Sequence, residues 1–283
     1  MFVVTGATGH LGRLIVRELL AGGAQPDQVV AGGRDVGRLG DLAGLGVRTA
    51  TVDYDDPAGM REAFAGAQTL VLVSGSEIGR RTAQHGAAID AAKAAGVRHI
   101  VYTSGPHADT SPLIVNPEHK ATEELLAASG LAYTAARDNW YTENYEQTFA
   151  QAAATGVVLT SAGDGRVASA PRADYAAAIA ALALRAGDET SVHELTGDVA
   201  WSFDEFAAAA SQALGRPVEH RAVSPEEHRT ALLAAGLDEG TVGFVLAMDA
   251  NIADGLLAIA TDEVRSLIGR PTTPLLETLR TWA

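Results

Sequence analysis

The first half of the chain alternates short apolar runs with longer segments of helical periodicity. The run Leu70-Val71-Leu72-Val73 is uninterrupted, which is typical of a strand buried on both faces of a sheet. Leucine and isoleucine recur three and four positions apart through residues 11–20, the spacing of one buried helix face, and Gly22-Gly23 ends that helix. The pattern predicts strands at residues 2–5, 28–32, 47–52, 69–74, 98–104 and 131–136, and helices at 11–20, 57–64, 80–95 and 117–129.

This regular alternation of strand and helix indicates a parallel sheet with helices on both faces. The alternation weakens after about residue 150, where the pattern predicts a strand at 156–160, a helix at 173–185, a short strand at 191–196 and a mostly helical chain from Ser202. We therefore expect a doubly wound α/β Rossmann domain over residues 1–150. A smaller, mostly helical lobe over residues 151–283 is expected to pack over one end of the sheet. The two are expected to interleave, with the helix at 173–185 returning to the first domain.

The amino-acid composition excludes several kinds of site and of binding partner. The 283 residues are 47% apolar and 20% charged, as in a globular protein, and none is cysteine, which excludes disulfides, thiolate metal sites and cysteine nucleophiles. A formal net charge of −14 offers no attraction to nucleic acid or to an anionic membrane, so the expected partner is a small molecule. The first residues have neither a basic flank nor a long apolar run, so we expect no signal peptide and a cytoplasmic location. No metal-binding, Walker or G-x-S-x-G motif is present, and we expect no metal.

A glycine-rich turn follows the first predicted strand and opens the first predicted helix. The sequence TGATGHLG places glycines at 6, 9 and 12: the first allows a tight turn, the second a close approach of the backbone to a pyrophosphate, and the third close packing of helix and strand. Free N–H groups at the helix start then bind the anion. The residues expected to cradle a dinucleotide are Gly6, Ala7, Thr8, Gly9, His10, Leu11 and Gly12.

The end of the second predicted strand bears on the choice of cofactor. Arg34 lies about 22 residues beyond Gly12, where a guanidinium binds the 2′-phosphate of NADP(H). Asp35, beside it, leaves two alternatives: it binds a ribose hydroxyl and permits NAD(H), or it caps the next short helix. We favour NADP(H), with NAD(H) as the alternative.

Polar residues after the third and fourth strands complete the predicted cofactor site. Asp53 either accepts a hydrogen bond from the adenine amino group or belongs to the acidic run that caps the helix at residue 57, and Tyr54 follows it. The chain after the fourth strand is expected to pass the ribose nearest the nicotinamide. It contributes Ser74, Gly75 and Ser76.

Motifs along the whole chain point to one family. HADTSPL at 107–113 and WYTENY at 140–145 are the most specific, and LTGD at 195–198 and GRPTT at 269–273 extend the match toward the C-terminus. Together with TGATGHLG, they resemble the atypical short-chain dehydrogenase/reductases of the NmrA-like group, and within it the type 2 NAD(P)H:quinone oxidoreductases. The resemblance implies an oxidoreductase that passes a hydride from NAD(P)H to a quinone without a flavin.

One feature of most short-chain reductases is missing. In those enzymes a Tyr-x-x-x-Lys pair lies on the helix after the fifth strand, and the tyrosine transfers a proton to or from the substrate. Here Val115 stands at the tyrosine position and His119 at the lysine position, while Lys120 is one residue out of step. A quinone accepts hydride without full prior protonation, so it suits this site better than a ketone does.

The resemblance also implies roles for residues around the nicotinamide. Tyr141, Asn144 or a water network bound to the ribose is expected to stabilise the developing oxyanion, and Trp140 or Tyr141 to stack on a flat substrate. His119 either contacts the nicotinamide ribose or packs, and His107 is expected at the pocket entrance. Thr103, Asn139 and Trp140 complete the predicted cofactor contacts, and Tyr145 the predicted substrate contacts.

Two other functions are alternatives at this stage. One is a tailoring reductase that acts on an aromatic, quinone-bearing metabolite, linked to later oxygen chemistry. The other is a non-catalytic NADP(H) redox sensor, as other NmrA-like proteins are. A homo-oligomer is compatible with all of these functions.

Overall fold

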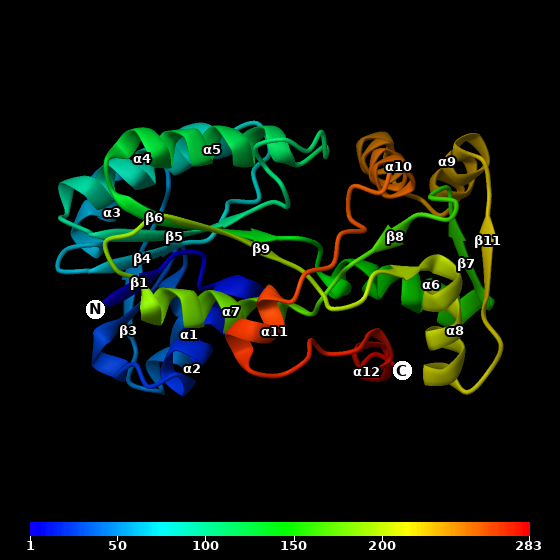
Figure 1. Ribbon diagram of the computed structural model, residues 1–283, viewed down its shortest axis with the longest axis horizontal. Coiled ribbons are helices and arrows are strands. Elements are labelled where there is room, and N and C mark those ends of the chain that lie inside the picture. The colour runs from blue at the N-terminus through cyan, green and yellow to red at the C-terminus, as the bar shows by residue number, and fades with distance from the viewer.

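The computed structural model describes residues 1–283 as two lobes lying side by side along the long axis (Figure 1). The larger lobe is built on one parallel sheet of seven strands in the order β3-β2-β1-β4-β5-β6-β9. Its strands are β1 (Phe2–Val4), β2 (Val29–Gly33), β3 (Arg48–Thr51), β4 (Thr69–Leu72), β5 (His99–Ser104), β6 (Ala132–Asp138) and β9 (Ser191–Leu195).

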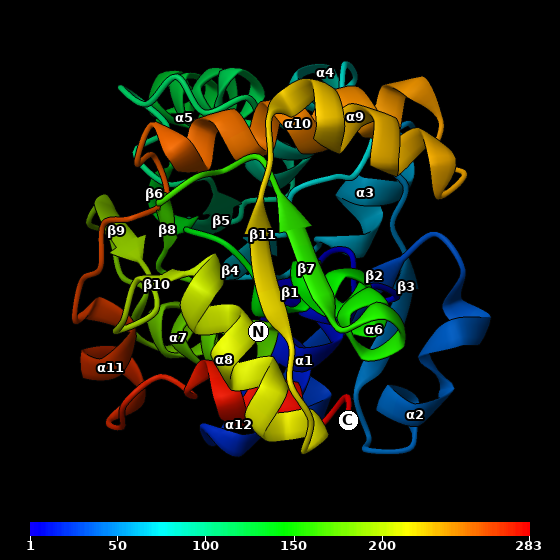
Figure 2. The same ribbon diagram turned by 90° about the vertical axis from the view of Figure 1, so that its right-hand side faces the viewer.

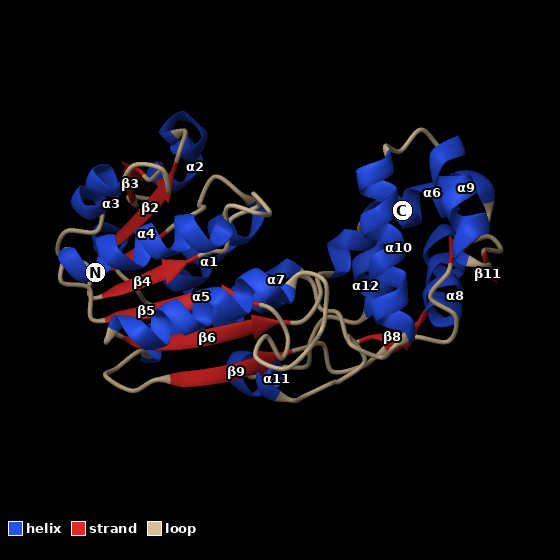
Figure 3. Cartoon of the chain, turned by 90° about the horizontal axis from the view of Figure 1, so that it is seen from above, coloured by secondary structure: helices blue, strands red, loops and turns tan.

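Helices cover both faces of this sheet, above and below it in Figure 1, and Figure 3 looks from above onto the face that carries α4 and α5. One face carries α3 (Pro57–Ala63), α4 (Arg81–Ala94) and α5 (Asn116–Ser129). The other carries α1 (His10–Ala21), α2 (Gly40–Ala43), α7 (Arg172–Arg185) and α11 (Glu263–Ile268). Two separate apolar layers result, because the sheet side chains alternate between the faces. The predicted doubly wound α/β fold is confirmed.

Strand β9 and helix α7 both come from the second half of the chain. Pairing of Asp138 with Leu195 places β9 alongside β6, at the edge of the sheet. Helix α7 packs against α1, and buried Ile179 belongs to the same apolar layer as Ile15. Residues 1–150 alone would therefore lack the edge strand β9 and the helix α7. The larger lobe is complete only with these two elements from the second half of the chain.

The second lobe has its own core, seen face-on in Figure 2. Its center is a cluster of aromatic rings, in which Tyr145 and Trp201 pack edge to face with centroids 5.0 Å apart. Its helices are α6 (Glu146–Thr155), α8 (Phe203–Leu214), α9 (Pro225–Ala234), α10 (Glu239–Ala253) and α12 (Leu275–Arg280). Capping boxes Ser202–Glu205 and Ser224–Glu227 begin α8 and α9.

Short strands in this lobe are the main difference from the sequence-based expectation. Strand β8 (Arg166–Val167) pairs antiparallel with β10 (Trp201–Ser202), and β11 (Glu219–Ala222) lies parallel to β7 (Val157–Thr160). The segment EHRA of β11 is polar and mostly exposed, so the sequence carries no apolar signal for a strand there. No helix in the protein is both long and apolar enough to cross a membrane.

Candidate active site

A cleft of about 1560 Å³ opens between the carboxyl ends of the parallel strands and the second lobe. Its volume exceeds the roughly 300–1,000 Å³ typical of a single small-ligand site. The strand order reverses at β1 and β4, and ligands of open α/β sheets bind in the crevice at such a switch point. The cleft is therefore large enough, and placed correctly, for a dinucleotide together with a second ligand.

The glycine-rich turn forms one end of the cleft. Gly6 has a φ of +61°, which a side chain would strain, and a Cβ on Gly12 would lie 2.5 Å from the Gly6 carbonyl oxygen. Gly9 is the N-cap of α1, and the only atom near its Cβ position is the Gly6 oxygen at 3.2 Å. The turn thus packs tightly on the protein side and stays bare on the cleft side, which fits a pyrophosphate at the helix N-terminus. Of the predicted residues 6–12, all line the cleft except Ala7, which is fully buried behind the turn.

Three arginines gather beside this turn. Arg34 is two-thirds exposed and pairs with Glu77 at 3.0 Å, and Arg13 and Arg38 also line the cleft. Asp35 has another contact: its carboxylate accepts a hydrogen bond from the Gly37 N–H at 3.0 Å and caps the short helix Val36–Leu39. The structure therefore places Asp35 in the capping role. Sequence analysis missed Arg13 and Arg38, although Arg13 directly follows the glycine-rich turn and Arg38 lies four residues beyond Arg34.

The acidic residues after β3 have different roles. Asp56 caps α3 through the Gly59 N–H, whereas Asp53 lines the cleft and accepts a hydrogen bond from the Asp55 N–H at 3.1 Å. The Tyr54 hydroxyl donates to the Val73 carbonyl at 2.7 Å, and its burial raises the pKa of the phenol well above its usual value. Tyr54 thus lines the cleft, and its hydroxyl holds it to the backbone of Val73.

Residues 74–76 line the next part of the cleft, and buried groups hold them from below. Thr103 is buried beneath the lining and accepts a hydrogen bond from the Ser74 N–H at 2.8 Å. The Gly75 N–H donates to Nε2 of His85 at 2.9 Å, so His85 carries its proton on Nδ1, 2.9 Å from the Thr122 hydroxyl. Burial lowers the pKa of His85 to about 4, which keeps it neutral. Sequence analysis missed His85, because one histidine on an alanine-rich helix gives no signal.

His119 of helix α5 and Val115, the residue just before this helix, line the cleft. The Nδ1 atom of His119 lies 2.8 Å from the hydroxyl of Tyr102, which is fully buried on β5. Burial lowers the pKa of His119 to about 3. His119 is therefore a neutral imidazole at physiological pH, held by Tyr102, and it has no imidazolium proton to give.

The segment after β6 brings most of the predicted catalytic residues together. Asp138, Asn139, Trp140, Tyr141, Asn144 and Tyr145 all line the cleft. The Tyr141 hydroxyl donates to Oδ2 of Asp138 at 2.8 Å, and the guanidinium of Arg172 lies 4.7 Å from the centroid of the Tyr141 ring. Arg172 also donates to Oδ1 of Asn144 at 3.0 Å. Asp138 was not among the predicted site residues, although it lies only two residues before the motif at 140–145.

Asn139 joins the two lobes. Its side-chain N–H groups donate to the carbonyls of Ala168 at 3.0 Å and Leu257 at 3.1 Å, while its Oδ1 is buried without a partner. Tyr145 packs into the aromatic core of the second lobe, and its buried hydroxyl also lacks a partner. Both residues therefore line the cleft, make a structural contact and carry a buried polar atom without a partner.

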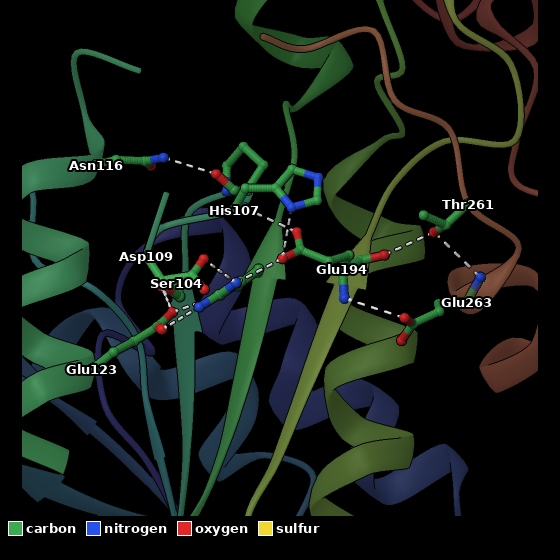
Figure 4. Close-up of polar contacts among 10 residues, drawn as sticks. Ser104, His107, Asp109, Asn116, Glu123, Glu194, Thr261 and Glu263 are labelled. Atoms are coloured by element: carbon green, nitrogen blue, oxygen red, sulfur yellow. Dashed lines mark hydrogen bonds and ion pairs between the residues drawn. The ribbon is translucent and has the colours of Figure 1, made fainter. Parts of the chain in front are cut away.

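His107 lies elsewhere, in a polar cluster at the ends of β5, β6 and β9 (Figure 4). Its N–H donates to Glu194 at 3.0 Å, and buried Arg137 pairs with Glu123 at 2.6 Å and with Glu194 and Asp109 at 2.8 Å. The expectation that His107 lines the pocket entrance is not met, because this cluster holds its loop against β9. The cluster fixes the loop that leads into α5.

The second lobe supplies an apolar wall and one polar pair. His228 of α9 and Asp249 of α10 are buried, with Nδ1 and Oδ2 2.9 Å apart, and Asp249 also accepts from the Ser161 hydroxyl at 2.8 Å. Sequence analysis missed this pair, since its members lie 21 residues apart without a motif. The apolar side chains of the wall are Leu232, Leu237, Phe244, Val245, Met248 and Ile252.

A glycine turn at the switch point of a doubly wound sheet, facing a second lobe across a large cleft, defines a dinucleotide-binding oxidoreductase. Comparison with known families makes this specific: residues 6–185 match the NAD(P)H-binding family, and the chain belongs to it. The chain is similar to quinone oxidoreductase 2 of Escherichia coli K12, with 41% identity over 279 residues that cover 99% of this chain and 97% of that protein. It is 29% identical to an NAD(P)H azoreductase of Xenophilus azovorans, covering 98% and 96% of the two chains.

Solved structures agree with these relatives. The crystal structure of the Escherichia coli NADPH-dependent quinone oxidoreductase in complex with NADPH superposes with a TM-score of 0.95, covering 99% of each chain. The Citrobacter sp. triphenylmethane reductase complexed with NADP(H) is 33% identical and superposes with a TM-score of 0.94 over the full length of both chains. The predicted membership among NmrA-like oxidoreductases of the Rossmann type is confirmed.

Proposed function

We propose that the protein reduces quinones with NADPH, by direct hydride transfer in the cleft between its lobes. One observation carries the proposal: Val115 and a neutral His119 occupy the wall where reductases of simple ketones need a proton donor and a lysine. A ketone becomes a strongly basic alkoxide and needs that donor beside its oxygen during hydride transfer, whereas a quinone spreads the negative charge over an aromatic ring and can take up its proton afterwards.

The names of the relatives describe hydride acceptors that delocalise the added charge. They are a quinone oxidoreductase, an azoreductase and a triphenylmethane reductase. Quinones, azo compounds and triphenylmethane dyes all take up a hydride into a conjugated system. The apolar wall of α9 and α10 and the rings of Trp140 and Tyr141 suit a flat aromatic substrate.

The residues around the cleft fit an NADP(H) molecule. The bare side of Gly9 and the N-terminus of α1 suit the pyrophosphate, and Arg34 and Arg38 suit a 2′-phosphate because Asp35 is engaged as a cap. At the opposite end, the unpaired Oδ1 of Asn139 is an acceptor of the kind that a carboxamide N–H satisfies. When bound, the cofactor supplies a hydride equivalent; the protein orients it and keeps water out.

The test is a comparison of acceptors. NADPH oxidation is followed by absorbance with a panel of quinones and a panel of aliphatic ketones, without added flavin. Rapid oxidation with quinones and negligible oxidation with ketones supports the proposal. Efficient reduction of ketones, or no reduction of any quinone, contradicts it. A location in the cytoplasm, where NADPH is available, is part of the same proposal.

A further inference from the structure

Asp138 is a buried carboxyl group with an unsatisfied oxygen at the wall of the cleft. It ends β6 and is 5% exposed. Its Oδ2 accepts a hydrogen bond from the Tyr141 hydroxyl at 2.8 Å, while its Oδ1 is buried without any partner. A buried ionised carboxylate that accepts only one hydrogen bond is costly, and the neutral acid removes most of that cost. The arrangement therefore favours the protonated form of Asp138.

The surrounding groups do not supply a counter-charge. On α7, the Tyr175 hydroxyl lies 3.3 Å from the Trp140 carbonyl oxygen, and Arg172 lies over the Tyr141 ring, where it pairs with Glu143 and Asn144. The neighbouring guanidinium on β6, that of Arg137, is engaged by Glu123, Glu194 and Asp109, and β9 faces Asp138 with Leu195. No arginine, lysine or histidine forms an ion pair with Asp138. Burial accordingly raises the pKa of Asp138 to about 7.

Protonation of Asp138 changes what Tyr141 can do. While Asp138 is ionised, the only proton of the Tyr141 hydroxyl is committed to Oδ2. When Asp138 carries a proton, the carboxyl group donates to the Tyr141 oxygen, and the phenol proton becomes available to another acceptor. Tyr141 lines the cleft in which the substrate would provide that acceptor. Tyr141 alone is a poor acid, because its burial and the nearby Asp138 carboxylate raise its pKa well above the usual value.

We propose that Asp138 is a neutral carboxylic acid that relays a proton through Tyr141 to the reduced substrate. The inference rests on the proposed function. Addition of a hydride to a quinone leaves a hydroquinone monoanion. As its oxygen takes the phenol proton of Tyr141, the Tyr141 oxygen takes the proton of Asp138, and Asp138 is left as a carboxylate. Asp138 regains a proton from water after product release, so each quinone consumes one hydride and one proton.

The first test is the pH dependence of quinone reduction in wild type and Asp138→Asn. General acid catalysis contributes about 10²–10⁴-fold where a strongly basic oxyanion forms. Because the ring already stabilises the hydroquinone anion, the variant should be slower below pH 7 by no more than the lower end of that range. Above about pH 8 the two rates should converge, because wild-type Asp138 is then ionised. Tyr141→Phe should be slow at every pH and lose the dependence. The control is Asp204→Asn, which removes an exposed carboxylate of the second lobe and should keep the wild-type profile.

The second test measures the carboxyl group itself, without cofactor or substrate. The infrared carbonyl stretch of a protonated acid should persist in wild type up to about pH 7 and be missing from Asp138→Asn, whereas Asp204→Asn should retain it. Its loss below about pH 5 overturns the inference, as do identical pH–rate profiles in wild type and Asp138→Asn. A wild-type protein that reduces no quinone overturns the proposed function and the relay with it. Quinone reduction with unchanged profiles overturns the relay alone.

Discussion

Arg34 and Glu77 form an ion pair, 3.0 Å between Nη1 and Oε1, that joins the end of β2 to the loop after β4. The pair lies where the 2′-phosphate of NADPH is expected to bind, and Glu77 is also held by Arg80 at 2.7 Å. A phosphate bound at this position would compete with the Glu77 carboxylate for the Arg34 guanidinium. We therefore expect Glu77 to weaken cofactor binding.

Replacement of the two partners should have opposite effects. Arg34→Ala should weaken NADPH binding by about 1.5–3 kcal/mol, the range for a charge-assisted hydrogen bond, and leave NADH binding nearly unchanged. Glu77→Gln should tighten NADPH binding by up to about fivefold, because exposed ion pairs contribute about 0–1 kcal/mol. Calorimetric titration of both variants with both cofactors measures this. Equal losses of NADPH and NADH affinity in Arg34→Ala would show that Arg34 does not contact the 2′-phosphate.

Two glycines of the turn should have different roles: Gly9 in cofactor binding and Gly12 in the stability of the fold. Gly9→Val should abolish cofactor binding and leave the fold largely intact, because the added side chain projects into the cleft. Gly12→Ala should destabilise the protein itself, because its Cβ would lie 2.5 Å from the Gly6 carbonyl oxygen. Gly40→Ala, where a Cβ meets no atom, is the matched control. Circular dichroism melts and NADPH titration separate the effects, and micromolar affinity in folded Gly9→Val would place the pyrophosphate elsewhere.

We expect His119 to position the cofactor and not to donate a proton to the substrate. Its pKa of about 3 means that it does not titrate between about pH 5 and 9, so His119→Ala should weaken cofactor binding without changing the shape of the pH profile of hydride transfer. Single-turnover measurements in wild type and variant check this. A pH-dependent step that disappears only in His119→Ala would identify His119 as a proton donor after all.

The carboxyl group of Asp138 should also leave a signature on stability. Its folded-state pKa of about 7 lies above the ordinary aspartate value of about 3.9, so the folded protein holds this proton more tightly than the unfolded chain does. The contribution to stability is present below about pH 4 and is lost as pH rises toward 7. Asp138→Asn should therefore gain stability relative to wild type over that window, by up to about 4 kcal/mol. Urea unfolding at several pH values measures the difference, and a constant difference would contradict the raised pKa.

Sequence analysis predicted the parts of the fold that depend on local pattern. The six strands of the first half and the helices between them follow from apolar runs and periodicity, and the glycine turn from its position between strand and helix. It missed what depends on distant contacts. The placement of β9 beside β6, the pair of His228 with Asp249 and the link from Arg137 to Glu194 join residues too far apart for any local signal.

The same limit explains the outcome for individual site residues. The motif that contains Tyr141 predicted a cleft residue, but its hydrogen bond to Asp138 depends on how the chain turns after β6. His107 stands in an equally specific motif, yet Glu194 of β9 holds it outside the cleft. A motif places a segment near a site, whereas the direction of each side chain is decided by neighbours that the motif does not contain.

The position of β9 has a consequence for how the protein is made. Strand β6 leaves the ribosome long before β9, and until β9 arrives the edge of β6 carries unpaired backbone groups. The apolar face of helix α1 likewise stays uncovered until α7 has been synthesised and packs against it. A product that stops near residue 150 should aggregate rather than form a smaller cofactor-binding protein, and the larger lobe should complete its folding only after most of the chain has been synthesised.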